Sequence, residues 1–258
     1  MSLPGVPVVE DASMDHVWWG LGLLTLSLVT LTLARVARLG LGVMPVTAVL
    51  RAVLQLSVIA LILRGVLAVP WTVALFVLLM LSTATLTAGS RLADLPRGRV
   101  LALLGVVAGA TVSLVLILAL RLVAFEARYV VAVAGIIVGN AMSAATLSGR
   151  NFLRGARARR DEVEAWLSLG ATPTHAYDEV GREAARESLL PNLDQTRSTG
   201  LVTLPGAFVG ALFGGASPVV AAQFQLVVLA GIGLTMLTTA LVVTRLAGRS
   251  PYVVPDPA

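Results

Sequence analysis

Long uncharged, apolar runs separated by short arginine-containing segments dominate the hydrophobic pattern of this chain. The longest runs are Val17–Ala34, Gly65–Ser90, Val100–Leu120, Tyr129–Gly149 and Ser198–Thr244. One membrane-spanning helix needs about 20 apolar residues. The last run is long enough for two helices, with a natural break at 214–218, where Ser217 can cap a helix that begins at Pro218. The pattern therefore predicts membrane-spanning helices.

One further span is bracketed by charge. The chain is apolar between Arg51 and Arg64, but this stretch is short for a bilayer. Extending it to Pro45–Leu67 gives a full span with both guanidinium groups near the interfaces, where long side chains reach water. The prediction is an all-α, polytopic membrane helical bundle of about seven transmembrane helices with a cytoplasmic amphipathic coupling segment. Its parts are an extracytoplasmic tail (1–16), five helices (17–147), the coupling segment (148–197), two helices (198–246) and a cytoplasmic tail (247–258).

Composition agrees with this class and removes several others. Of the 258 residues, 57% are hydrophobic and 13% are charged, against about 25% charged in soluble domains. Cysteine is absent, which excludes disulfides and thiolate metal sites. All 19 basic residues are arginine, so the phosphate-binding loop that requires lysine cannot form. No catalytic constellation is present, and an enzyme is not expected.

The arginines orient the bundle, because cytoplasmic loops carry the excess of positive charge. One side receives only Arg64, Arg121 and Arg128, together with the acidic N-terminal tail. The other side receives Arg35, Arg38, Arg91, Arg97, Arg99, Arg150, Arg154, Arg157, Arg159, Arg160, Arg182, Arg186, Arg197, Arg245 and Arg249. This distribution predicts a multi-pass protein of the cell (inner or plasma) membrane, with its N-terminus outside and its C-terminus in the cytoplasm.

The cytoplasmic segment carries the pattern of two short amphipathic helices. Val163, Trp166 and Leu167 share one face of the first, which Gly170 can end in a left-handed cap. Thr172 then fits a helix N-cap with Pro173 in the first helical position. The second helix has an apolar stripe, and Pro191 is expected to end or kink it. The members of that stripe are Tyr177, Val180, Ala184 and Leu189.

Two interpretations of this helix pair stay open. A stiff helix seated in a partner's groove can transmit that partner's movement to the membrane. Alternatively, the pair lies on the lipid surface, to which the basic stretch Arg154–Arg160 is attracted. Spacing alone does not separate a docking element from a lipid-bound one, and membrane lipid is an expected partner in either case.

Several short segments occur together in this chain: Ala134–Met142, Leu167–Pro173, Leu190–Pro191 with Asp194, Thr199–Gly206, Pro218, Gln225, and Arg51 with Gln55. Together they resemble the FetB-type ABC permeases, a family of bacterial iron-export permeases and plant aluminium-tolerance relatives. The segment from Glu164-Ala165 to Gly170 also looks like the opening of the EAA loop, with which ABC permeases dock on their ATPase subunit. The resemblance covers about Pro45 to Leu246.

The resemblance implies a homodimeric permease paired with a separate cytoplasmic ABC ATPase that binds ATP and Mg and powers export of iron or a related metal cargo. This chain would then bind no cofactor itself, and nucleic acid is not an expected partner. The resemblance places ATPase coupling on Glu164, Ala165, Trp166, Leu167, Gly170, Ala171, Thr172 and Pro173. The alternative is an ion-coupled carrier or channel that acts without an ATPase.

Polar or special residues within the predicted spans are candidates for the translocation path, since intramembrane polar groups are costly. They are Arg51, Gln55, Asn140, Met142, Pro205 and Gln225. For Asn140 and Gln225 interhelical hydrogen bonding is the favoured alternative, and for Arg51 an interfacial anchor. No metal site is evident, because His16 and His175 fall on opposite sides of the predicted bundle.

Glycines spaced by four predict where helix backbones approach closely. They are Gly105 and Gly109, Gly135 and Gly139, and Gly206, Gly210 and Gly214.

Overall fold

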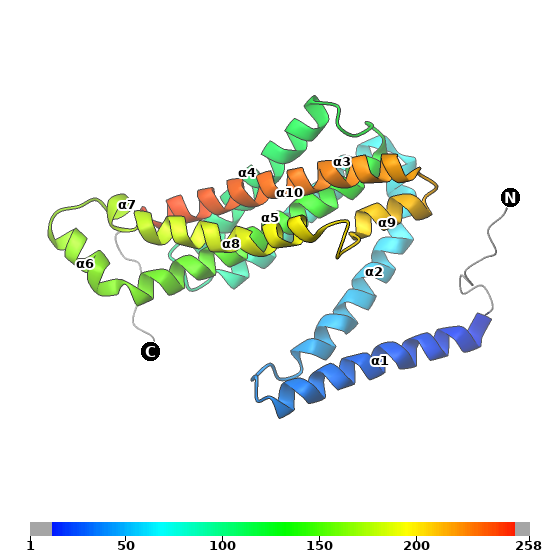
Figure 1. Ribbon diagram of the computed structural model, residues 1–258, viewed down its shortest axis with the longest axis horizontal. Helices are drawn as coiled ribbons and strands as arrows, with labels where there is room; N and C mark the ends of the chain where they lie inside the picture. The colour runs from blue at the N-terminus through cyan, green and yellow to red at the C-terminus, as the bar shows by residue number, and fades with distance from the viewer. Residues whose placement is uncertain (1–11, 251–258) are drawn as a thin grey trace. The chain divides into compact units, whose positions relative to one another are not determined.

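A computed structural model describes residues 12–250. Most of the predicted extracytoplasmic tail (1–16) and of the C-terminal tail (247–258) lies outside the described residues. The elements are α1 (Ala12–Val36), α2 (Met44–Ala68), α3 (Pro70–Arg91), α4 (Gly98–Ala119), α5 (Ala127–Ala158), α6 (Arg160–Ser168), α7 (Pro173–Ala176), α8 (Asp178–Ser198), α9 (Gly206–Phe213) and α10 (Pro218–Ala247) (Figure 1).

Long apolar helices make up most of the fold. Six of the helices in the described part are long and apolar enough to cross a membrane: α1, α2, α3, α4, α5 and α10. The break at 214–218 forms as predicted, because the Ser217 side chain accepts a hydrogen bond from the Val220 amide and Pro218 opens α10. The prediction of an all-α polytopic membrane bundle is confirmed.

The predicted sixth span, at the start of the run 198–244, does not form as one long helix. Only α9 forms there, and its 8 residues extend about 12 Å, too little to cross a bilayer. Residues 199–205 stay irregular, because Gly200 has a positive φ of 94° and Pro205 cannot donate a backbone hydrogen bond. The count of seven long helices was therefore too high by one.

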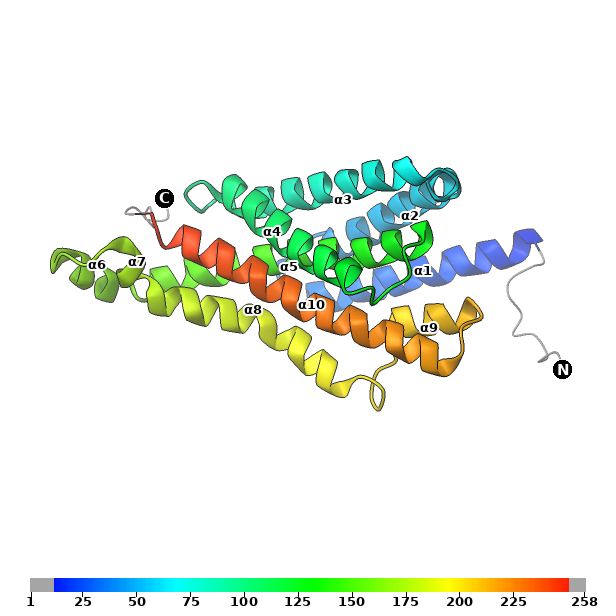
Figure 2. The ribbon, with the colours of Figure 1, turned by 90° about the horizontal axis from the view of Figure 1, so that it is seen from above.

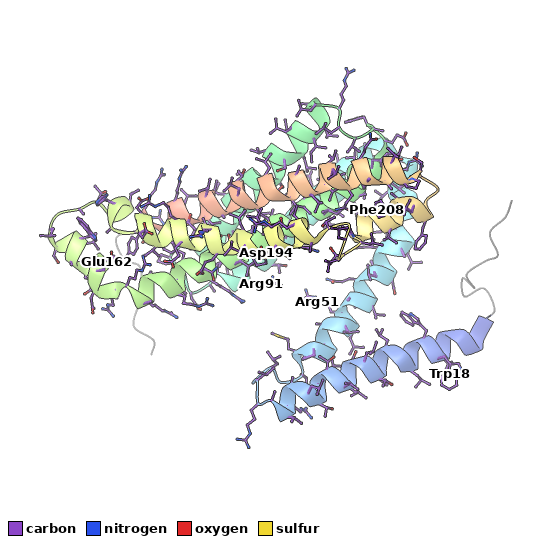
Figure 3. All side chains as sticks on the ribbon, in the orientation of Figure 1. Trp18, Arg51, Arg91, Glu162, Asp194 and Phe208 are labelled. Atoms are coloured by element: carbon purple, nitrogen blue, oxygen red, sulfur yellow. The ribbon has the colours of Figure 1, made fainter. Side chains whose placement is uncertain are left out.

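The chain divides into two compact units, residues 1–65 and 66–258. The first holds α1 and most of α2, joined by a turn in which Arg38, Gly40 and Gly42 have positive φ. Most described side chains on these two helices are exposed, including those of Trp18 and Arg51 (Figure 3). Such wide apolar surfaces need a cover of lipid or protein.

In the second unit, α4 and α10 pack closely in antiparallel directions. A side chain at Gly105 would collide with Val243, and one at Gly109 with Thr239. These two predicted glycine contacts are confirmed. A Cβ added at Gly206 or Gly210 of α9 would meet no described atom within 4 Å, so the predicted close approach is not seen at these two glycines.

Helix α8 runs back along α5 and α10 (Figure 2). It begins where Val180 lies against Gly155 of α5 and Gly181 lies against Thr244 of α10. The predicted stripe is the packed face, since Val180 and Ala184 are buried and belong to the main core cluster. Pro191 lies inside α8, which continues to Ser198, so this proline does not end the helix.

Together α8 and α9 return the chain to the end of the bundle where α10 begins. The start of α8 adjoins the C-terminal ends of α5 and α10, where Tyr177 packs against Phe152 and Gly248. At the other end, α9 is joined by a short turn at 214–217 to Pro218. A charged helix and a short apolar one therefore replace the predicted sixth span.

Candidate functional site

The candidate coupling turn joins α6 to α7 at residues 169–172. The Gly170 amide donates to the Leu167 carbonyl at 3.0 Å, and the Ala171 amide donates to the Trp166 carbonyl at 3.0 Å. Gly170 has a φ of +86°, the left-handed conformation that ends many helices and favours glycine. The sequence prediction of a left-handed cap at Gly170 is confirmed.

The second half of the turn is fixed by a helix cap and a ring contact. The Thr172 hydroxyl accepts a hydrogen bond from the His175 amide at 3.4 Å, and Pro173 occupies the first turn of α7. The Trp166 and His175 rings meet edge to face, with centroids 5.2 Å apart. This contact ties α6 to α7 and makes the turn one stiff unit.

The turn is anchored to the ends of the long helices. Val163 of α6 is buried in the main core cluster, and Tyr177 packs its ring against Phe152 of α5 at 5.7 Å. An ion pair of 2.6 Å joins Arg159 to Glu183 of α8. Because that pair is partly solvated, it contributes at most about 1 kcal/mol, and apolar packing provides most of the anchoring.

Burial raises the pKa of the Tyr177 phenol above its ordinary value of 10.0, and the nearby Glu164 carboxylate raises it further. The folded state therefore holds the phenolic proton more tightly than the unfolded chain. The stability that the protonated phenol contributes is full below about pH 10 and is lost as the pH rises through the folded pKa.

We expect the thermal unfolding midpoint to fall more steeply above pH 10 in the wild type than in Tyr177→Phe, measured in detergent. Equal slopes would contradict this.

The tip of the turn is exposed. Leu169 is 81% exposed and Trp166 43% exposed, and Gly170 is exposed as well. Glu162, at the start of α6, is also exposed (Figure 3). An apolar tip with an acidic edge, mounted on a rigid base, suits a groove in another protein. Of the predicted coupling residues, the structure brings Trp166, Leu167 and the 170–173 turn into this one element. Glu164 pairs with Arg160 at 2.7 Å, and Ala165 is exposed.

The candidate path residues are divided between the two units. Arg51 and Gln55 are exposed on α2, in the first unit. Asn140 donates to the Ile136 carbonyl of its own helix α5 at 2.8 Å, and Met142 packs against the main core. Pro205 and Gln225 are linked through α9, since Pro205 precedes that helix and Gln225 bonds to it.

Gln225 supplies the hydrogen bond that the start of α9 lacks. Its Oε1 accepts from the Phe208 amide at 3.1 Å, one of the unpaired N–H groups at a helix N-terminus. Gln225 is only 5% exposed, and Phe208 is labelled in Figure 3. The interhelical bond favoured from the sequence is therefore present at Gln225, whereas Asn140 bonds within its own helix.

We expect Gln225→Leu to destabilise α9, because the Phe208 amide loses its partner at a cost of about 1–3 kcal/mol. Hydrogen exchange at residues 206–213 measures the effect and should become faster. Gln223→Leu is the matched control, since Gln223 lies two positions away and is exposed. Equal exchange in the two variants would contradict this role of Gln225.

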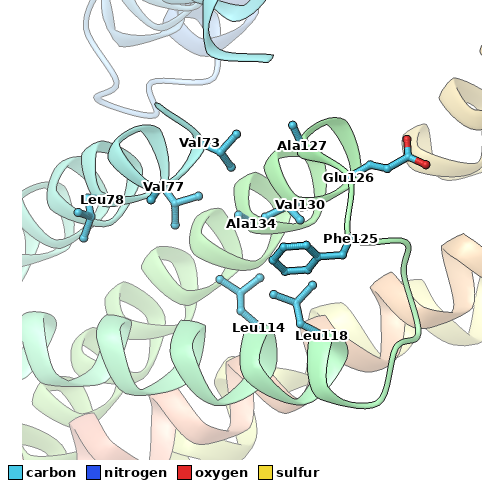
Figure 4. A pocket seen from close by; sticks show the side chains of 11 residues that line it. Val73, Val77, Leu78, Leu114, Leu118, Phe125, Glu126, Ala127, Val130 and Ala134 are labelled. Atoms are coloured by element: carbon cyan, nitrogen blue, oxygen red, sulfur yellow. The ribbon is translucent and has the colours of Figure 1, made fainter. Parts of the chain in front are cut away.

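A wide pocket between α3, α4 and α5 is almost entirely apolar (Figure 4). Its volume is about 690 Å³, and Val77, Leu114, Leu118 and Phe125 line it. Glu126 at the rim pairs with Arg128 at 2.8 Å. Among residues 12–250 no group of three or more His, Cys, Asp or Glu side chains lies close enough to hold a metal ion. The pocket therefore suits hydrocarbon rather than a metal.

Sequence reasoning missed a polar contact between α4 and α10. The Thr235 hydroxyl lies 2.7 Å from that of Ser113, and both are fully buried. Thr239, one turn further along, has a buried hydroxyl that meets no hydrogen-bond partner among the described residues. The spacing of Thr235 and Thr239 opposite the Gly105 and Gly109 pair was the signal available in the sequence.

Comparison with known proteins gives consistent matches along most of the chain. A rice relative (Oryza sativa subsp. japonica), UPF0014 membrane protein STAR2, is 39% identical over 74% of this chain and 68% of its own length. Protein ALUMINUM SENSITIVE 3 of Arabidopsis thaliana is 37% identical over 69% of this chain and 66% of its own. The probable iron export permease protein FetB of Escherichia coli is 30% identical, over 69% and 70%.

No solved structure matches the chain significantly. Residues 18–252 match the family described as "Uncharacterised protein family (UPF0014)". That stretch contains all six long helices except the first residues of α1, and it includes the coupling turn. The chain is thus a multi-pass membrane protein, and it belongs to the UPF0014 family.

Proposed function

We propose that this chain is the membrane-spanning permease subunit of an ABC transporter that exports iron or a related metal cargo. ATP is bound with Mg and hydrolysed by a separate cytoplasmic subunit, and the turn between α6 and α7 couples that subunit to the membrane helices. The observation that carries the proposal is the stiff, exposed 169–172 turn in a chain related to a named iron export permease.

Two features of the chain support this division of labour. The sequence has no lysine, so the motor that uses a phosphate-binding lysine resides in another polypeptide. The turn is mounted on α5 and α8, both of which pack against α10. A push on Leu169 or Trp166 therefore reaches three long helices through packed side chains.

The same proposal includes two copies of the permease and a fixed orientation. The C-terminal end of α10 and the turn face the cytoplasm, and the N-terminus lies outside. Six long helices alone would leave both termini on one side. The return of the chain through α8 and α9 provides the seventh crossing, which agrees with the orientation deduced from the arginines.

Reconstitution tests the proposal. We expect the purified chain to move ferrous iron into or out of proteoliposomes only when its partner ATPase and ATP are both present. The ATPase should co-purify with the chain, and its rate should rise with the transported metal. Iron movement by the chain alone, at the rate of the complete system, would favour an ion-coupled carrier or channel and overturn the proposal.

A further inference from the structure

The exposed side of α8 carries charge well beyond the coupling turn. Glu187, Asp194 and Arg197 follow one another at helical spacing and are all exposed. We name them the α8 polar face. Asp194 is 67% exposed and Arg197 82%, with their charged atoms 3.6 Å apart. The opposite side of α8 is buried against α5 and α10.

Contacts between α8 and α10 show which residues of α10 lie beside the α8 polar face. Gly181 of α8 lies against Thr244, and Leu189 packs against the cluster formed by Ala144 of α5 and Val228, Ile232 and Met236 of α10. The two helices thus run antiparallel and side by side (Figures 1 and 2). At a rise of 1.5 Å per residue, Asp194 lies about 20 Å beyond Gly181 and level with about Gly231.

The helices that meet at the level of Gly231 are apolar there. Helix α10 has no charged residue from Pro218 to Thr244. At Gly231 it meets Ile117 of α4 and Ile137 of α5, both within the uncharged runs 100–120 and 129–149. A plane through Gly231 therefore cuts the apolar part of three membrane-spanning helices. By the helical rise alone, Asp194 is level with that plane.

A charged side chain facing lipid near the centre of a membrane costs about 2.5–3.5 kcal/mol, so such groups face protein or water-filled cavities. We propose that the α8 polar face lines a water-filled path within the membrane, where the carboxylates of Glu187 and Asp194 meet a cationic cargo. The second half of α8 then belongs to the membrane region rather than to the predicted cytoplasmic segment 148–197. The cargo part rests on the proposed function; the water-filled lining rests on the geometry alone.

The chemistry of the face suits passage of a cation. Glu187 and Asp194 lie about 10 Å apart along the helix and offer oxygen ligands at two successive depths. The Arg197 guanidinium lies 3.6 Å from the Asp194 carboxylate and would compete with the cargo for it. Such competition would weaken cargo binding and favour release, which conduction requires.

Because the chain has no cysteine, single-cysteine variants report water access without background. Glu187→Cys and Asp194→Cys test the face. Leu237→Cys on α10 and Leu116→Cys on α4 are matched controls at about the same two levels, and both native leucines are 43% exposed. Glu179→Cys, at the start of α8, is the water-exposed reference. Each variant is labelled in vesicles, in the full complex, with a charged maleimide from the cytoplasmic side.

We expect positions 187 and 194 to be labelled at rates similar to that of position 179. Positions 116 and 237 should react at least about 100-fold more slowly, since thiolates do not form in lipid. Fast labelling of all positions would place this level in the cytoplasm and overturn the proposal. Protection of positions 187 and 194 would show a dry interface and would also overturn it.

A charge substitution tests the cargo part separately. We expect Asp194→Asn to lower ATP-dependent iron transport about tenfold or more, because a neutral amide does not replace the carboxylate charge. Asp194→Glu keeps the charge and should retain most of the rate. We expect the ATPase to co-purify with both variants as it does with the wild type. If no ATPase co-purifies even with the wild type, the proposed function is rejected rather than the assignment of Asp194. Unaltered transport in Asp194→Asn would overturn the assignment of Asp194.

Discussion

Gly170→Pro is expected to abolish coupling between ATP hydrolysis and transport while leaving the membrane bundle folded. Proline fixes φ near −65°, whereas Gly170 has a φ of +86°. The substitution also removes the amide that donates to Leu167. The turn must open, and the rigid link from α6 to α7 is lost. Transport per ATP should fall at least about tenfold, the effect of losing about 1.4 kcal/mol of coupling.

Gly170→Asn is the matched control, because asparagine tolerates a left-handed conformation better than other non-glycine residues. Its coupled transport should stay close to the wild-type value. Both variants should show the wild-type thermal unfolding midpoint for the bundle, since Gly170 is exposed and contacts no core residue. Wild-type coupling in Gly170→Pro would contradict the role given to this turn.

Gly109→Ala is expected to weaken the bundle itself. An added Cβ would overlap the Thr239 hydroxyl and come within 2.8 Å of the Thr235 carbonyl. Both groups belong to α10, so α4 and α10 must separate. Overpacking of this kind costs about 1–3 kcal/mol, which more than offsets the gain of about 1 kcal/mol from replacing a helical glycine with alanine.

The control for Gly109→Ala is Gly233→Ala, because no atom lies within 4 Å of a Cβ at Gly233. Thermal unfolding in detergent should show a lower midpoint for Gly109→Ala and an equal or higher one for Gly233→Ala. The same midpoint shift in both variants would mean that α4 and α10 do not pack at Gly109.

Local signals in the sequence predicted the parts of the fold that depend on few neighbouring residues. The caps at Ser217 and Thr172 depend on one side chain and the amide three positions later. The turn at Gly170 depends on one left-handed residue. The long helices follow from uncharged runs that match the bilayer thickness. For these features, residue type and spacing are sufficient.

Features that depend on tertiary packing could not be predicted in the same way. The uncharged run 198–244 has enough apolar residues for two spans, yet only α10 is long, because Pro205 and the turn at Gly200 interrupt the first. Likewise, the charge pattern of α8 does not reveal that its buried stripe packs along α5 and α10. Hydropathy along the chain does not report which helix lies beside which.

The candidate site likewise contains both local features and features that depend on tertiary packing. The coupling turn is local, and its cap residues were identified correctly from the sequence. The partner of Gln225 was not predictable, because the Phe208 amide is brought to it by the fold of α9 onto α10. The residues proposed for the translocation path stay predictions, and the structure adds Glu187 and Asp194 to be tested beside them.

Site-directed cross-linking at the turn is the most direct test of the central claim, that this turn docks on a separate ATPase. Leu169→Cys places the only thiol of the chain at the exposed tip. Leu122→Cys, exposed in the segment between α4 and α5, is the control on the opposite side of the bundle. With a short bifunctional thiol-to-amine reagent, position 169 should cross-link to the ATPase and position 122 should not. Co-purification of an active ATPase without any cross-link from position 169 would contradict the account.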